Sequence, residues 1–149
     1  MHVIILLLSS ILGSVLTYYF SLRFKQSAVR SSALLSLIVG LFFYGFPDLL
    51  PAYLTRNIPV VFFGSSFIGM VSSEAKVGYF RLGIAGVLFC GLYIYKSPLF
   101  DGYGGGLGAL AFISLLATMG FSEVVFKHSK IKDILLDLRK RYLMDNDDR

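Results

Sequence analysis

Five stretches of this sequence contain no Asp, Glu, Lys or Arg, and they constrain the fold more than any other feature. They cover residues 1–22, 31–47, 57–73, 82–95 and 102–122. A charged residue at the centre of a membrane-spanning helix costs about 2.5–3.5 kcal/mol, and about 20 residues cross the hydrocarbon layer. The first and last stretches are long enough to span unaided. The second extends back to Ser27 and the fourth past Lys96 to Phe100, because a lysine side chain reaches the headgroups.

The composition agrees with a membrane protein. Of the 149 residues, 56% are hydrophobic and 15% are charged, whereas about 25% are charged in an ordinary soluble domain. We predict an all-α polytopic membrane protein of about five transmembrane helices, which form a single membrane domain over residues 1–149. We expect the first span to stay as an anchor and not to be cleaved. A signal peptide has Lys or Arg before its apolar run, and none precedes the run here. The predicted segments are a first span (1–22), one hairpin (27–74), a second hairpin (82–123) and a cytoplasmic tail (124–149).

The positions of Lys and Arg predict the orientation, because cytoplasmic loops collect these residues. With the N-terminus outside and five spans, twelve of the fourteen basic residues lie on the cytoplasmic side, and only Arg56 and Lys96 lie outside. We therefore expect a cell-membrane protein, in the bacterial inner membrane, with its N-terminus outside and its C-terminus in the cytoplasm. The net charge of +5 then reflects this bias and attraction to anionic lipid, rather than nucleic-acid binding.

The two predicted hairpins resemble each other in sequence. Residues 40–47 align with 91–98, and residues 59–74 align with 108–123, with nine identities in 24 compared positions. Under the predicted threading the two copies run parallel, related by an axis along the membrane normal. The alternatives are a site at the seam between the copies, as in transporters, or a plain four-helix bundle.

Small residues four positions apart predict close helix packing. Such spacing is frequent in this sequence, and the pairs singled out are Ser65 with Gly69, Gly86 with Cys90, and Gly104 with Gly108. A sharper interpretation concerns residues 64–66, in the middle of a short span, where hydroxyls or the carbonyl oxygens of an unwound segment can line a polar path. The candidate pathway residues are Ser65, Ser66, Ser114 and Thr118, with Glu74 and Glu123 at the inner mouth.

Glu74 and Glu123 occupy matching positions of the two copies. Ionisable groups within a membrane commonly bind cations or carry protons, but both are predicted at the interface, where solvation or local pairing with Lys76 and Lys127 is the alternative. The glycine-rich run at residues 101–108 predicts a loop or re-entrant turn, because each glycine costs a helix about 1 kcal/mol relative to alanine.

The tail predicts an amphipathic helix. Apolar residues recur on one helical face between residues 131 and 142, and residues 127–142 carry a charge of +4. Such a helix lies on the inner leaflet or docks onto a partner. The candidate lipid or partner contacts are Lys127, Lys130, Lys132, Arg139, Lys140 and Arg141.

Catalytic and metal chemistry find little support in the sequence. Cys90 is the single cysteine, and His2 and His128 are the only histidines, so one chain cannot build a His/Cys metal cluster. We expect no cofactor and no enzymatic activity. The leading hypothesis is a channel or transporter for a small solute or ion that works as a homo-oligomer. The alternative is a non-catalytic assembly or regulatory subunit of a membrane complex that docks a partner through its tail.

Overall fold

The computed structural model describes residues 2–75, 78–95 and 105–124. These residues form five α-helices and one short 3-10 helix, and no strand occurs among them. The chain divides into two compact units, residues 1–118 and 119–149. The elements are α1 (His2–Phe24), α2 (Ala28–Gly45), η1 (Pro47–Leu49), α3 (Ala52–Ala75), α4 (Tyr79–Ile94) and a last helix at Gly105–Val124.

Four of these helices are long and apolar enough to cross a membrane: α1, α2, residues 52–71 of α3, and residues 105–124. This confirms the all-helical fold and is consistent with a membrane location. Helix α4 has 16 residues, which extend about 24 Å against a hydrocarbon core of about 30 Å. The count of five spans therefore stays a prediction.

The chain reverses between α1 and α2 through a turn that its own residues specify. Lys25 follows α1 with φ 49°, in the left-handed region that commonly ends a helix. Ser27 then caps α2, its side chain accepting a hydrogen bond from the Arg30 backbone N–H, as N-cap serines do. The reversal therefore takes only three residues.

The structure differs from the sequence prediction at three places. Helix α3 begins at Ala52 and passes through Arg56 and Pro59, because an arginine near a helix end can reach the interface. Residues 64–66 lie in continuous helix rather than in an unwound segment. The last helix begins at Gly105, so the expected loop over 101–108 is wrong for residues 105–108. A backbone that leaves water must satisfy its hydrogen bonds internally, and this outweighs the low helix propensity of glycine.

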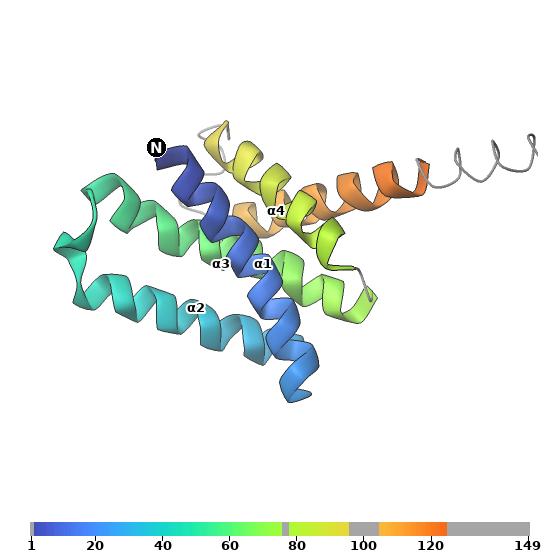
Figure 1. Cartoon of the computed structure of the whole chain (residues 1–149), viewed down its shortest axis with the longest axis horizontal. Helices are drawn as coiled ribbons and strands as arrows, with labels where there is room; N and C mark the ends of the chain where they lie inside the picture. Colours follow the sequence, from blue (N-terminus) through green and yellow to red (C-terminus); the bar gives the residue numbers. More distant parts are fainter. Residues whose placement is uncertain (1, 76–77, 96–104, 125–149) are drawn as a thin grey trace, which may run out of the picture. The chain divides into compact units, whose positions relative to one another are not determined.

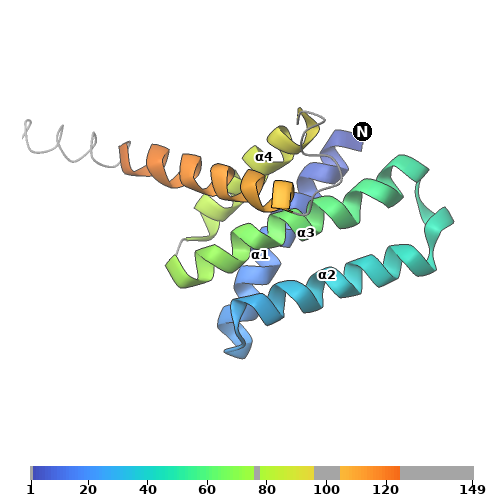
Figure 2. The same ribbon diagram turned by 180° about the vertical axis from the view of Figure 1, so that it is seen from behind.

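Helices α1 to α4 run in alternating directions along the chain, and Figure 1 shows α2 and α3 side by side, joined at η1. Helix α1 crosses α3 and is its main packing partner, and the view from behind shows the same crossing (Figure 2). Helix α1 also packs against α4. Helices α1 and α3 therefore form the centre of the first unit.

The polarity of the described helices is inverted relative to a water-soluble protein. Large apolar side chains are exposed along every helix, among them Leu12, Leu37, Leu41 and Leu116. The eleven polar side chains that are buried are all serines or threonines. Hydrocarbon solvates large apolar side chains, and small residues let helix backbones approach each other. This inversion supports the membrane location independently of helix length.

Candidate functional site

Helix α1 buries a stripe that consists mostly of small residues. Its buried residues form two rows at four-residue spacing, and most of them carry a hydroxyl or are glycine: Leu6, Ser10, Ser14, Tyr18, and Ser9, Gly13, Thr17, Ser21. Residues four apart lie on one helical face. The stripe faces α3 and α4, the helices that α1 contacts most closely.

Glycines on three helices make these contacts very close. A methyl group built on Gly69 of α3 would run into the carbonyl oxygen of Ser14 and lie 2.8 Å from Cβ of Thr17. A methyl group on Gly13 would meet Oγ of Ser65 and lie 2.8 Å from the Phe62 carbonyl oxygen. The α1 and α3 backbones therefore touch without intervening side chains.

Helix α4 meets α1 in a similar way. The Ser10 hydroxyl donates a hydrogen bond of 2.7 Å to the carbonyl oxygen of Gly86. A methyl group on Gly86 would lie 3.3 Å from Cα of Ile11. The structure therefore brings Ser65, Gly69 and Gly86, from the predicted small-residue pairs, against one stripe of α1.

Ser66 joins α2 to α3. Its hydroxyl donates to the Phe63 carbonyl oxygen at 2.7 Å, and the Ser32 hydroxyl lies 2.7 Å from the Ser66 oxygen. A serine has one O–H to donate, so Ser32 is the donor to Ser66. The Ser36 hydroxyl lies 3.4 Å from the same oxygen. We call seven buried hydroxyl residues on α1, α2 and α3 the hydroxyl seam: Ser9, Ser10, Ser14, Thr17, Ser32, Ser65 and Ser66.

Two hydroxyls of the seam lack a partner. Among the described residues, nothing hydrogen-bonds to Oγ of Ser9 or Oγ1 of Thr17, although both atoms are buried. An unpaired buried hydroxyl costs about 1–3 kcal/mol, and a polar group left in this state calls for an explanation such as water or a ligand. Thr17 lies directly against Gly69, in the α1–α3 interface.

The remaining pathway candidates lie in the last helix and at the end of α3. Ser114 and Thr118 are buried, and their hydroxyls donate to carbonyl oxygens of their own helix, those of Leu110 and Ser114. Glu74 is in the last turn of α3, and its side chain lies outside the described part. Glu123 is exposed and belongs to the second unit.

The other residues of the predicted small-residue pairs are Cys90, Gly104 and Gly108. Cys90 is fully buried on α4. No described atom lies within 4 Å of a methyl group built on Gly108, so this glycine makes no close approach there. Gly104 and the six tail cations, Lys127, Lys130, Lys132, Arg139, Lys140 and Arg141, lie outside the described residues.

Sequence reasoning missed two features. One is the α1 stripe, which is legible as the four-residue recurrence of Ser, Gly and Thr from residue 9 to 21. The other is a hydrogen-bonded link between the first half of α3 and the last turn of α4. The Tyr93 hydroxyl donates to Oδ1 of Asn57 at 2.7 Å, and Nδ2 of Asn57 donates to the Tyr53 carbonyl oxygen at 2.7 Å. Asn57 and Tyr93 are 36 residues apart, so no local sequence pattern predicts that their side chains meet.

Comparison of the chain with family models, with curated proteins and with solved structures gives no match. Among the described residues no three His, Cys, Asp or Glu side chains gather as metal ligands do, and every buried polar side chain there is a neutral hydroxyl. What the seam offers chemically is hydrogen bonding without charge.

Proposed function

We propose that this protein moves a small polar solute or ion across a cell membrane and has no catalytic role. The observation that carries the proposal is the pair of buried, unpartnered hydroxyls of Ser9 and Thr17 in the hydroxyl seam. Because the α1 and α3 backbones touch at Gly69, the proposed path opens only when these helices separate, and a solute or water that then enters would supply the missing hydrogen bonds. Because the buried polar groups are neutral, a neutral hydrogen-bonding solute suits the seam better than a bare ion.

The proposal includes an orientation and an oligomer. The proposed location is the bacterial inner membrane. The N-terminus would lie outside and the C-terminus in the cytoplasm, as the distribution of Lys and Arg favours. Four or five short helices in one copy scarcely enclose a solvated path, so the proposed path is completed in a homo-oligomer. In support, the buried residues of α2 end at Leu35, and its second half exposes Leu37, Ile38, Leu41 and Phe42.

We also propose that the two hairpins arose by duplication. In support, the aligned residues Ser65 and Ser114 are both fully buried, whereas the aligned residues Phe63 and Phe112 are both exposed. Equivalent burial is what two parallel copies in one membrane require. Ser65→Ala and Ser114→Ala should then affect transport to a similar extent.

Proteoliposomes test the transport proposal. Purified protein is reconstituted, and flux is measured for glycerol and urea by light scattering and for protons and potassium ions with dyes. Thr17→Val keeps the shape of the side chain and removes the unpartnered hydroxyl, so it should lower the flux of any transported probe. Thr55→Val is the matched control, because the Thr55 hydroxyl bonds only to local carbonyl oxygens near η1. Equal flux in wild type, Thr17→Val and empty liposomes rejects transport of these probes.

The acidic inner mouth has a separate test. Glu74→Gln and Glu123→Gln remove the charges while keeping the size of the side chains. If the pair gates the path, proton or potassium flux falls in both variants. Unchanged flux for every transported probe removes the acidic gate from the proposal and leaves the seam.

A second candidate is a non-catalytic assembly or regulatory subunit. The exposed second half of α2 favours it, because a partner helix could cover that face instead of another copy. The tail cations between Lys127 and Arg141 would then contact the partner. Affinity purification with and without residues 127–149 separates the two functions. Loss of a stoichiometric partner on truncation favours the subunit.

A further inference from the structure

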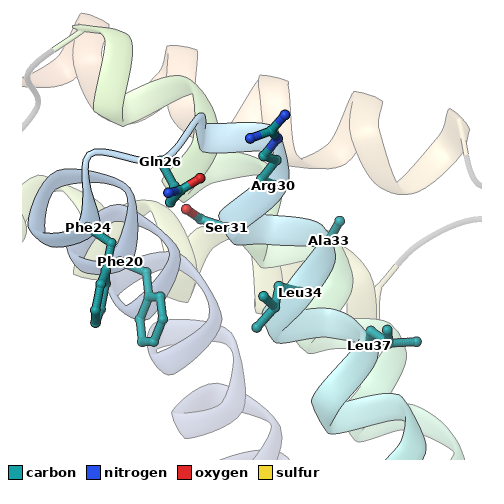
Figure 3. Close-up of a pocket in the computed structure, with 8 residues that line it drawn as sticks. All are labelled: Phe20, Phe24, Gln26, Arg30, Ser31, Ala33, Leu34 and Leu37. Atoms are coloured by element: carbon teal, nitrogen blue, oxygen red, sulfur yellow. The ribbon is translucent and has the colours of Figure 1, made fainter.

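An open groove lies between the last turns of α1 and the first half of α2, with a volume of about 670 Å³ (Figure 3). Both helices belong to the first unit. The residues that line the groove are Phe20, Phe24, Gln26, Arg30, Ser31, Ala33, Leu34 and Leu37. The groove is outside the hydroxyl seam and shares only Leu37 with the exposed α2 face that supports the oligomer.

The walls of the groove are apolar. The rings of Phe20 and Phe24 lie next to each other along α1, with centroids 4.7 Å apart and planes tilted by 31°. Figure 3 shows them on one side of the groove, with Leu34 and Leu37 along the other. Leu34 and Leu37 are exposed. From Ser31 to Leu37 the α2 wall extends about 9 Å along the helix axis. The shape suits an extended hydrocarbon chain.

One end of the groove is polar and positively charged. Gln26, Arg30 and Ser31 lie at this end, next to the α1–α2 turn (Figure 3). Arg23 and Lys25 are exposed on the same turn. The sequence has no acidic residue before Asp48, which follows the far end of α2. The N-terminus of α2 adds the positive end of its helix dipole.

We propose that this groove binds one anionic phospholipid, with an acyl chain between the phenylalanine and leucine walls and the phosphate against Arg30. Arginine pairs with phosphate through two parallel hydrogen bonds, and basic pockets between transmembrane helices bind anionic headgroups. The turn lies at the end of two spans, so the polar end sits at headgroup level and the apolar walls extend into the hydrocarbon. A free anion would leave the walls unused, and a zwitterionic lipid would leave the basic end without a net opposite charge.

The test uses full-length protein purified in detergent and stripped of lipid. Thermal unfolding is followed while phosphatidylglycerol is added, and in parallel while phosphatidylcholine with the same acyl chains or glycerol phosphate is added. We expect saturable stabilisation by phosphatidylglycerol and little by the other two. Equal stabilisation by phosphatidylcholine overturns the role of charge, and equal stabilisation by glycerol phosphate overturns the role of the groove walls.

Variants locate the site. Arg30→Gln removes a charge-assisted bond and should raise the half-saturating concentration of phosphatidylglycerol about tenfold. Arg23→Gln is the matched control, because Arg23 carries the same charge in the last turn of α1 but does not line the groove, and it should change little. Equal loss in both variants means attraction by net charge alone and overturns the site. Ala33→Phe fills the groove without changing charge, so an unaltered response in that variant also overturns it.

Discussion

The hydroxyl oxygens of Ser32 and Ser66 lie 2.7 Å apart in the α2–α3 interface, and Ser32 is the donor because the Ser66 hydroxyl is committed to the Phe63 carbonyl oxygen. Both side chains are buried. This hydrogen bond links α2 to α3, and the Ser36 hydroxyl lies 3.4 Å from the same Ser66 oxygen.

A double-mutant cycle should detect this link. We expect Ser32→Ala and Ser66→Ala to be coupled by about 0.6 kcal/mol and by no more than about 1.7 kcal/mol, the range for hydrogen bonds between transmembrane helices. The measurement is reversible unfolding in mixed micelles. The Ser36 hydroxyl is 3.4 Å from Ser66, so the Ser36→Ala and Ser66→Ala cycle should give a smaller coupling. A larger coupling for Ser36 would contradict the assignment of the main bond.

Gly69→Ala should strongly destabilise the first unit. The added methyl group would run into the Ser14 carbonyl oxygen, which is backbone and cannot move aside like a flexible side chain. Overpacking of this kind costs about 1–3 kcal/mol. Gly40→Ala is the control, because no described atom lies within 4 Å of that methyl group, and alanine favours helix by up to about 1 kcal/mol. Similar unfolding free energies for the two variants would show that α1 and α3 are not in contact at Gly69.

Tyr93→Phe should cost about 0.5–1.5 kcal/mol of unfolding free energy. The change removes the hydrogen bond from the Tyr93 hydroxyl to Asn57 and keeps the buried ring. Tyr95→Phe serves as the control, because Tyr95 is 89% exposed and surface changes usually stay within about 0.5 kcal/mol. If both variants unfold alike, the α3–α4 link contributes nothing measurable.

The positions of the long helices could be predicted from the sequence because charge is costly in hydrocarbon, and a stretch without charge is easily read. The same test placed the start of the third helix five residues late, since it treats Arg56 as a boundary. The spacing of small residues was used to predict packing at residues 65–69, 86–90 and 104–108 but not in the first span, where Ser9, Gly13 and Thr17 recur in the same way. Which hydroxyls meet, such as Ser10 with the Gly86 carbonyl oxygen across 76 residues, depends on how helices cross. No local pattern contains that information.

Replacing Lys25, the left-handed residue of the turn after α1, by glycine should increase the unfolding free energy. Lys25 has φ 49°, a conformation that costs a residue with a side chain about 1–2 kcal/mol and costs glycine little. We expect Lys25→Gly to unfold at higher denaturant than Lys25→Val. Both variants lose the same charge, so their difference reports the backbone alone. A β-branched residue that matches glycine here would mean that the turn has another conformation in the bilayer.

The single cysteine should report the opening of the helix bundle. Cys90 is fully buried on α4, so a maleimide can reach it only when α4 separates from its neighbours, and labelling should be much slower in folded protein than in SDS. A cysteine introduced by Tyr95→Cys in a Cys90→Ala background should label rapidly, because position 95 is exposed. Gly69→Ala should speed the labelling of Cys90, since a looser α1–α3 contact lowers the free energy of local opening. If Cys90 in the folded wild-type protein is labelled as fast as the cysteine at position 95 in the folded variant, α4 does not pack as the structure has it.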